Sequence, residues 1–307
     1  MSDVAETTSQ VIALFGPTGV GKTAIAVALA GRLRERGEQP VAVSADALQV
    51  YRGLETLTGV ASPDERAALE HRLLSFVPVD ATFSVGEYAE LAHAEIDSLL
   101  AAGRRPIVVG GTGLYLRAAL ADLDLRPAPV DGTRERWMDE LRRDGAPALH
   151  RQLAARAPWA AETIDQNNSH RIVRALELLD AGALEPLEGP SQLWSEELRR
   201  PTLLVGLTME RTALYELIDA RVDGMLAAGA REEVLRAQTA GASETARKAL
   251  GFDELLAGDV ETMKRRTRNY ARRQLAWMRK LAGVELIDVT GRAPVAVAEE
   301  ILDCCRR

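Results

Sequence analysis

The strongest constraint on the fold of this chain is a glycine-rich stretch that fits G-x-x-x-x-G-K-[ST], the pattern of a phosphate-binding loop. Its residues are Gly16, Pro17, Thr18, Gly19, Val20, Gly21, Lys22 and Thr23. The apolar run Val11–Phe15 before it is short enough for a buried strand, and the Ala- and Leu-rich segment 23–36 after it is typical of a helix. Because the motif requires strand, loop and helix in this order, we predict an α/β fold with a phosphate site after the first strand.

Each part of this loop can stabilise a bound phosphate. Its backbone N–H groups converge on an anion, and the N-terminus of the following helix adds a partial positive charge. Lys22 supplies a positive charge for the outer phosphates, and Thr23 can place its hydroxyl on a Mg²⁺ ion that bridges them. We therefore expect Mg²⁺ as the cofactor. The motif leaves open which phosphate compound is bound and whether phosphoryl transfer is the reaction.

Composition excludes several other classes of protein. The chain has 307 residues, of which 47% are hydrophobic, enough for one large domain or two smaller ones. No apolar run approaches the roughly 20 residues that cross a bilayer, and residues 1–10 lack a signal pattern. Cys304 and Cys305 are adjacent and cannot cross-link distant parts of the fold, which favours a reducing compartment. Together these features lead us to expect a cytoplasmic protein that binds no membrane. The net charge of -7 argues against wholesale coating of nucleic acid but permits a local basic surface.

Two further loops follow buried-strand patterns. Asp46 comes just after the apolar run 41–44, and a second glycine-rich turn containing Thr112 comes after Ile107–Val109. The carboxyl ends of parallel strands meet at one edge of a sheet, so both loops are expected near the phosphate loop. Asp46 is then a metal-site residue, a general base or a helix N-cap, and its position does not decide between these. Thr112 is a candidate hydroxyl donor.

The middle of the chain reads as helices without an intervening strand. We expect helices at 134–143, 147–157 and 169–179, after an interruption at Arg126–Pro129, and a linker at 185–195. The apolar run 202–207 then restores a buried-strand pattern. We assign 122–199 to a helical insertion domain and assign 1–121 with 200–307 to the core domain. The predicted fold class is α/β: a P-loop NTPase-like parallel sheet core with helices on both faces and a helical insertion domain.

Local periodicity places the remaining elements. We expect helices at 65–74, 85–102, 210–229 and 293–305 and a last strand at 284–288. In the helix at 210–229, Arg211 and Arg221 lie ten residues apart and so on roughly the same side. Either arginine could clamp a diphosphate, or pair with Asp219 or Asp223 on the surface.

Two stretches are candidates for contact with nucleic acid. Residues 262–280 hold eight basic residues and no acidic one, which is typical of a polyanion-binding helix, although a soluble basic helix is the alternative. Helical spacing indicates that one side of this helix packs, through Met263, Tyr270, Ala271, Gln274, Trp277, Met278 and Leu281. The basic residues expected to project are Lys264, Arg265, Arg268, Arg272 and Arg279. In the polar stretch 166–174, His170, Arg171 and Arg174 could contact phosphates or bases, or form a solvated helix face.

Taken in order, several stretches resemble the tRNA dimethylallyltransferase (tRNA isopentenyltransferase) family. They are Gly16–Thr23, Ser44–Asp46, Gln49–Gly53, Gly110–Tyr115, Asn167, Arg171–Ile172, Arg174–Glu177, Leu214–Tyr215, Ile218–Asp219, Arg221–Asp223, Met225–Leu226, Ala249–Phe252, Thr267–Arg268, Tyr270–Ala271, Arg273–Gln274 and Trp277. The resemblance covers nearly the whole chain. The first motif alone is generic, but the ordered set is specific.

The resemblance implies transfer of a dimethylallyl group from dimethylallyl diphosphate to N6 of an adenosine adjacent to the anticodon of tRNA, with release of diphosphate. The phosphate loop then holds the prenyl diphosphate and not ATP. Lys22, Mg²⁺ on Thr23, and Arg221 would stabilise the leaving diphosphate. Asp46 matches the family's base that takes a proton from the adenine amine, and Thr112 matches a hydroxyl near the reacting groups. We expect a monomer.

The resemblance also implies the residues that contact the anticodon stem-loop. They are Asp46, Ala47, Leu48, Gln49, His170, Arg171, Ile172, Val173, Arg174, Arg247, Lys248, Gly251, Phe252, Arg268 and Arg272. The chain departs from the family pattern at Val60, where a lysine is usual, at Asn168, where an aspartate is usual, and at Leu217, where an arginine is common. These departures concern tRNA contact and rate, because every predicted catalytic residue is retained.

Three other functions fit parts of the sequence. An adenylate prenyltransferase has a similar first half, but the helical insertion and the basic C-terminal helix favour tRNA as the acceptor. A P-loop small-molecule kinase would bind and turn over ATP. A non-catalytic RNA-binding module would bind tRNA with a steep salt dependence and make no product.

Overall fold

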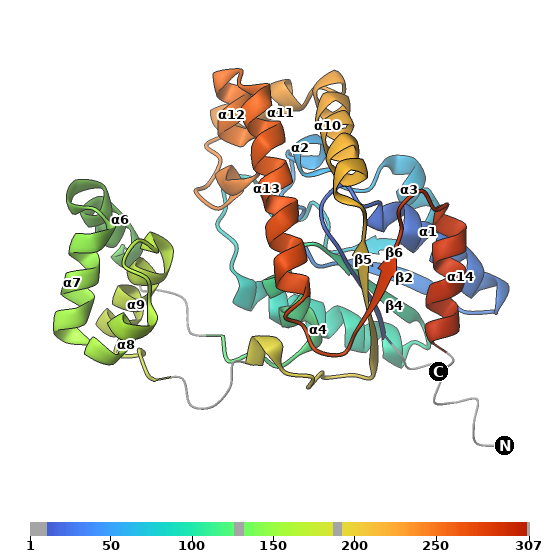
Figure 1. The fold of residues 1–307 in the computed structure, drawn as a ribbon, viewed down its shortest axis with the longest axis horizontal. Helices are drawn as coiled ribbons and strands as arrows, with labels where there is room; N and C mark the ends of the chain where they lie inside the picture. The colour runs from blue at the N-terminus through green and yellow to red at the C-terminus, as the bar shows by residue number, and fades with distance from the viewer. Residues whose placement is uncertain (1–10, 126–131, 187–191, 306–307) are drawn as a thin grey trace. The chain divides into compact units, whose positions relative to one another are not determined.

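The computed structural model describes residues 11–125, 132–186 and 192–305 (Figure 1). The predictions for residues 1–10 and for Arg126–Pro129, and part of the predicted linker, lie outside these residues. The chain divides into two compact units, a core unit of Met1–Leu123 with Leu193–Arg307 and an insertion unit of Asp124–Gln192. None of the helices in the described ranges is both long and apolar enough to cross a membrane.

The core unit is built on a parallel sheet. Within its described residues, six strands pair in the order β3-β2-β4-β1-β5-β6. The strands are β1 (Val11–Phe15), β2 (Pro40–Ser44), β3 (His71–Arg72), β4 (Arg105–Gly110), β5 (Thr202–Thr208) and β6 (Val284–Asp288). Every residue of β1 and β2 is buried, as expected for strands covered on both faces. The α/β prediction with a parallel sheet is confirmed.

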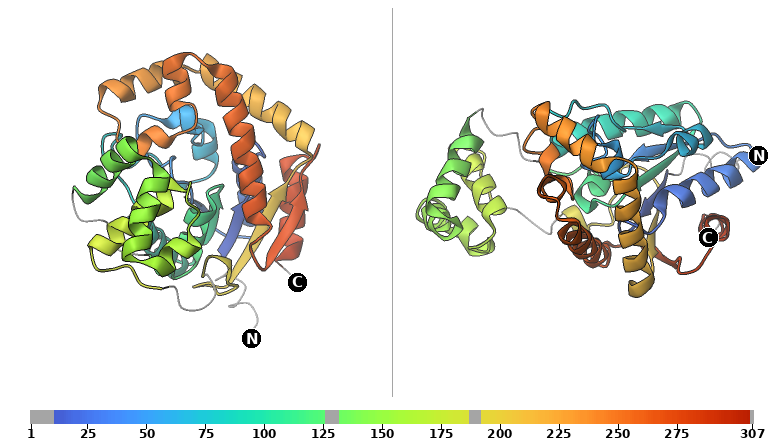
Figure 2. Two further views of the ribbon diagram at one scale, coloured as in Figure 1. Left: turned by 60° about the vertical axis from the view of Figure 1, so that its left-hand side comes forward. Right: turned by 90° about the horizontal axis from the view of Figure 1, so that it is seen from above.

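Helices cover both faces of this sheet. The helices described in the core unit are α1 (Lys22–Glu35), α2 (Glu55–Thr58), α3 (Pro63–Ala68), α4 (Val85–Ala101), α5 (Gly113–Leu120), α10 (Arg211–Ala227), α11 (Ala230–Thr239), α12 (Phe252–Ala257), α13 (Val260–Met278) and α14 (Pro294–Cys304). Helices α1 and α14 bury Leu29 and Ile301 in the main core with Leu14 of β1. The next residue, Phe15, faces the other way and meets Trp277 of α13 with ring centroids 5.7 Å apart. Helix α13 therefore runs along the face opposite α14 (Figures 1 and 2).

The predicted helix at 65–74 is wrong in its second half. Helix α3 begins with a capping box in which Ser62 accepts from the Glu65 N–H, and it ends at Ala68. Leu69 is fully buried in an extended conformation, and the next residues pair with β2 as the short strand β3. The unpaired edge of β2 thus outweighs the helical propensity of this segment.

The insertion unit has its own hydrophobic core. Its helices are α6 (Thr133–Asp144), α7 (Ala146–Arg156), α8 (Pro158–Thr163) and α9 (Ser169–Asp180). Helices α6, α7 and α9 correspond to the three that periodicity predicts, whereas α8, only six residues long, was not predicted. The buried side chains that join these helices include Trp137, Leu149, Leu153, Ile172 and Leu176.

Candidate active site at the phosphate loop

A cavity of about 680 Å³ lies in the core unit, where β1, β2 and β4 end. Segments that are far apart in the sequence line it: the phosphate loop, the turn after β2, the second glycine-rich turn, and helices α10 and α13. The sequence-predicted residues on its wall are Lys22, Thr23, Asp46, Thr112 and Arg221. The structure therefore brings the candidate catalytic residues to one place.

The phosphate loop has the backbone of an anion site. Gly19 and Gly21 have φ of 85° and 90°, in the left-handed region that glycine tolerates best. Gly21 is the N-cap of α1, and it has no side chain that could take up the N–H groups of the first helical turn. These N–H groups and the helix dipole favour a negative ligand at this end of α1.

Two cations face this loop, and neither forms an ion pair with a carboxylate of the described residues. The Lys22 ammonium donates to the carbonyl oxygens of Gly16 and Pro17 at 3.0 and 2.9 Å. Burial lowers the pKa of Lys22 to about 8, with a further decrease from the charge of Arg221 and an opposing increase from Asp46. The excess of positive charge favours a multivalent anion in the cavity.

Arg221 is the arginine of α10 that reaches the cavity. Its side chain is half-buried, its Nη2 lies 3.5 Å from the carbonyl oxygen of Gly59, and burial lowers its pKa. Arg211 is exposed at the start of the same helix and does not line the cavity. The alternative pairing with Asp219 or Asp223 is also decided, because these carboxylates pair with Arg268 at 2.7 Å and with Lys264 at 2.7 Å. Arg221 alone of the two candidates can clamp a diphosphate here.

Asp46 is held by a turn and faces a hydroxyl. Its Oδ1 accepts from the N–H of Leu48 at 2.9 Å, and no helix follows, so the helix N-cap alternative is wrong. Its Oδ2 lies 3.5 Å from the Thr112 hydroxyl, which is itself 3.3 Å from the hydroxyl of Tyr270. Burial, together with the charge of Asp46, raises the pKa of Tyr270 to about 12, so this phenol stays protonated.

Two residues of α13 at the site were not predicted as site residues. They are Tyr270 and Gln274, one helical turn apart. Gln274 accepts from the N–H of Thr18 at 2.8 Å and donates to the carbonyl oxygen of Gly111 at 2.7 Å. Periodicity placed both on the packed side of the basic helix, but that pattern gave no sign of what they contact.

The predicted donor set fits a Mg²⁺ ion that shares its ligands with a phosphate compound. Among the described residues, no three His, Cys, Asp or Glu side chains gather in a way that could hold a metal. Thr23 and Asp46 offer hard oxygen atoms on the cavity wall, beside the anion site. Mg²⁺ usually takes only one or two protein ligands and completes its shell with phosphate oxygens and water.

The basic residues of α13 differ in their exposure to solvent. Arg265, Arg266, Arg272, Arg273 and Arg279 are exposed. Arg268 and Lys264 are instead tied to the carboxylates of α10, and the Arg268 side chain is 27% exposed. Of the residues expected to project, Arg265, Arg272 and Arg279 do so.

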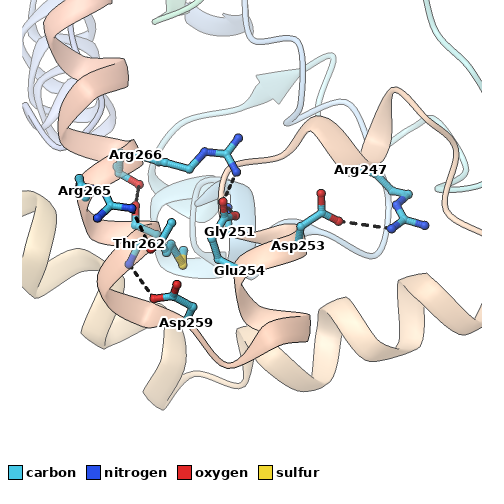
Figure 3. A network of polar contacts seen from close by, with 10 residues as sticks. Arg247, Gly251, Asp253, Glu254, Asp259, Thr262, Arg265 and Arg266 are labelled. Carbon is cyan, nitrogen blue, oxygen red and sulfur yellow. Dashed lines mark hydrogen bonds and ion pairs between the residues drawn. The ribbon is translucent and has the colours of Figure 1, made fainter. Parts of the chain in front are cut away.

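The stretch 247–252 forms a braced turn beside α13. Glu254 accepts from the N–H of Gly251 at 3.1 Å and pairs with Arg266 (Figure 3). Phe252 is fully buried. Arg247 is exposed, pairs with Asp253 at 3.3 Å and lies over the Phe252 ring. This stretch thus offers charge from Arg247 and from the exposed Lys248, which lines the cavity, while Gly251 and Phe252 shape the turn.

After β2, Ala47, Leu48 and Gln49 line the cavity next to Asp46. The Gln49 carboxamide donates to the carbonyl oxygens of Thr58 and Gly59 at 3.3 and 3.2 Å. It therefore braces the segment before Val60. Nothing in the structure explains the departures at Val60 and Leu217.

In the insertion unit, the predicted contacts of α9 divide into two groups. Ile172 and Val173 are 0% and 1% exposed in the core of the unit, and Arg174 pairs with Glu177 at 3.2 Å. His170 and Arg171 are exposed. We retain His170, Arg171 and the partly exposed Arg174 as candidates for RNA contact.

Asn168 caps the same helix. Its side-chain oxygen accepts from the N–H of Arg171 at 3.2 Å. Asparagine and aspartate are about equally good N-caps, so this departure keeps the structural role of the usual aspartate.

Comparison with known proteins gives one family. The model of the IPP transferase family matches residues 49–281. A tRNA dimethylallyltransferase from Thermobifida fusca is 40% identical over 317 residues, covering 97% of each chain. The crystal structure of a tRNA isopentenylpyrophosphate transferase from Bacillus halodurans is 31% identical, covers 97% of this chain and 95% of that chain, and has a TM-score of 0.67. A eukaryotic dimethylallyltransferase acting on tRNA, 24% identical with a TM-score of 0.68, covers 92% of this chain and 74% of that chain and shares the fold.

Proposed function

This chain belongs to the tRNA dimethylallyltransferase (tRNA isopentenyltransferase) family, and on that premise we propose that it transfers a dimethylallyl group from dimethylallyl diphosphate to N6 of an adenosine adjacent to the anticodon of tRNA. The observation that carries this proposal is the convergence of Lys22, Arg221, Asp46 and Thr112 on one cavity. Anion-binding groups and a carboxylate with a hydroxyl partner are the chemistry that this reaction needs.

The reaction exchanges one bond for another. The adenine amine nitrogen forms a bond to the allylic carbon, and the carbon–oxygen bond to the diphosphate breaks. The diphosphate leaves with the bonding electrons. Loop N–H groups, Lys22 and Arg221 stabilise the charge that develops on it.

Asp46 is the group that takes the proton of the amine. A positioned base of this kind contributes about 10²–10⁴-fold to the rate. Thr112 donates toward Asp46 or toward the diphosphate, and the protonated Tyr270 keeps the Thr112 hydroxyl oriented. If Mg²⁺ is bound with the diphosphate, the Thr23 hydroxyl would hold it, and its charge would offset that of the leaving group.

The acceptor is recognised mainly through positive surface. We assign the exposed Arg272 of α13, together with Arg247 and Lys248, to the phosphates of the anticodon stem-loop. The exposed His170 and Arg171 are the corresponding candidates on the insertion unit. The target base leaves its stack to reach the cavity, as bases that undergo chemistry do.

The test is a reconstitution with the purified chain, Mg²⁺, dimethylallyl diphosphate and tRNA, followed by mass spectrometry of the nucleosides. We expect one prenylated adenosine per tRNA, and no product from a tRNA whose adenosine next to the anticodon is replaced by guanosine. Prenylation of AMP without prenylation of tRNA would identify an adenylate prenyltransferase. ATP turnover that depends on a small acceptor would identify a kinase, and tight tRNA binding without product a binding module.

A further inference from the structure

Helix α13 contacts three successive residues of the second glycine-rich turn. Gln274 donates to the carbonyl oxygen of Gly111 at 2.7 Å, and Tyr270 lies 3.3 Å from the Thr112 hydroxyl. The ring of Trp277 covers Gly113 so closely that a Cβ there would lie 2.2 Å from it. One face of α13 therefore fixes the turn that carries Thr112.

Gln274 also reaches the phosphate loop. Its carboxamide oxygen accepts from the backbone N–H of Thr18 at 2.8 Å, and the side chain is 5% exposed. The orientation of the amide follows from its partners, because a backbone N–H can only donate and a carbonyl oxygen can only accept. A single buried side chain thus bridges the two loops.

The two loops are packed against each other around this bridge. A Cβ on Gly111 would lie 2.5 Å from the Gln274 Nε2, 3.2 Å from the Gly16 oxygen and 3.3 Å from the Lys22 ammonium. Because the carboxamide accepts from one loop and donates to the other, it couples the position of the second glycine-rich turn to that of the phosphate loop. A shorter or apolar side chain would leave the Gly111 carbonyl oxygen without this partner and release the turn.

We propose, resting on the proposed function, that Gln274 is a positioning residue that locks the second glycine-rich turn to the phosphate loop and so holds the Thr112 hydroxyl between Asp46 and the departing diphosphate. Gln274 lines the cavity, and its carboxamide is engaged by backbone atoms of both loops. Its loss therefore lowers the rate of the chemical step and leaves the affinity for tRNA unchanged.

The first arm compares Gln274→Met with the wild type in single-turnover prenylation of tRNA. We expect the rate at saturating substrates to fall about 10²-fold, the size of effect that a misplacement of about 1 Å produces. We expect the Kd for tRNA to stay within about twofold, since the exposed arginines are untouched. Gln238→Met, the same change at an exposed position of α11, is the matched control and keeps the wild-type rate. An unchanged rate in Gln274→Met, or a loss confined to tRNA affinity, would overturn the proposal.

The second arm uses Gln274→Glu, which guards against a folding defect in the methionine variant. A protonated carboxyl can accept from Thr18 and donate to Gly111 like the carboxamide, whereas a carboxylate can only accept. The rate of Gln274→Glu relative to the wild type should therefore rise as the pH falls. A ratio that does not change with pH contradicts a role for the donated hydrogen bond.

The third arm does not depend on the reaction. Hydrogen exchange of the Thr18 amide should be faster in Gln274→Met than in the wild type, because this N–H loses its acceptor. Equal exchange overturns the bridge whatever the activity. Absence of product from the wild-type chain would instead contradict the proposed function.

Discussion

The cavity of the core unit and the packed interior of the insertion unit treat buried charge in opposite ways. In the insertion unit, the fully buried Glu177 side chain pairs with Arg134 at 3.0 Å and with Arg174 at 3.2 Å. In the core cavity, the cations Lys22 and Arg221 have carbonyl oxygens as their hydrogen-bond partners. The insertion unit satisfies its charges internally, as a structural element does. The core cavity keeps positive charge that a bound diphosphate would neutralise. We therefore assign the paired charges of the insertion unit to stability and the cations of the cavity to ligand binding.

The largest expected effect tests Asp46, the proposed base beside these cations. The substitution Asp46→Asn keeps the shape of the side chain but removes the base. The rate of prenyl transfer should therefore fall by about 10²–10⁴-fold. Single-turnover kinetics with saturating tRNA and donor measure this change. Asp64→Asn, an exposed carboxylate of α3, is the control and should leave the rate unchanged. A wild-type rate in Asp46→Asn would show that Asp46 is not the base.

The second effect tests the excess of positive charge directly. The pKa of Lys22 is about 8, so Lys22 is mostly charged at pH 7 and mostly neutral at pH 9 in the protein without ligand. A bound diphosphate stabilises the charged form, so affinity should be lost as the pH rises through this value, by about tenfold at one unit above it.

Calorimetric titration with inorganic diphosphate at pH 7 and pH 9 measures this loss. Lys22→Met is neutral at both values and corrects for ionisation of the ligand itself. An identical pH dependence in the wild type and in Lys22→Met would show that Lys22 does not titrate at the site.

A smaller effect tests whether the insertion unit is held by local capping. Asn168→Ala removes the acceptor for the Arg171 N–H and should destabilise the start of α9 by about 1 kcal/mol. Hydrogen exchange of the Arg171 amide in the full chain reports this change. Asn168→Asp should keep the protection, since aspartate also accepts this bond, and Asn167→Ala should have little effect. Equal exchange in all four proteins would mean that the cap does not stabilise α9.

The smallest effect compares the two units as RNA-binding surfaces. Removing one phosphate contact by Arg272→Gln or by Arg171→Gln should lower the slope of log Kd for tRNA against log salt by about 1. Binding assays at several salt concentrations measure both slopes. A change in the Arg272 variant alone would confine phosphate recognition to the core unit, and a change in neither would remove both arginines from the interface.

The sequence predicts the parts of the site that depend on local order. The phosphate loop lies between a strand and a helix, and Asp46 and Thr112 follow strands directly, so the geometry of a parallel sheet brings them together. Tyr270 and Gln274 depend instead on the path of α13 across the sheet. Helical spacing shows which side of that helix packs but not which loop it meets, so their roles needed the structure.

Two other differences between the sequence-based predictions and the structure have physical causes. Residues 71–72 pair with β2 although the preceding residues favour a helix, because an open sheet edge competes with helix propensity. Ile172 and Val173 fall within a stretch that resembles an RNA-contacting motif, yet they are buried. Their apolar character and their spacing from Leu176 already indicate the packed side of α9.

The order of the strands has a consequence for how this chain folds during synthesis. β1 lies between β4 and β5, and β5 begins only at Thr202, after the insertion unit. Until that segment leaves the ribosome, the apolar strand Val11–Phe15 has one open edge, on which other chains can pair. The insertion unit, whose helices contact each other locally, can fold first. The chain therefore passes through a stage in which a finished helical domain follows an unfinished sheet. Chaperone demand should be greatest there, before Arg221 and Gln274, which complete the site, have been made.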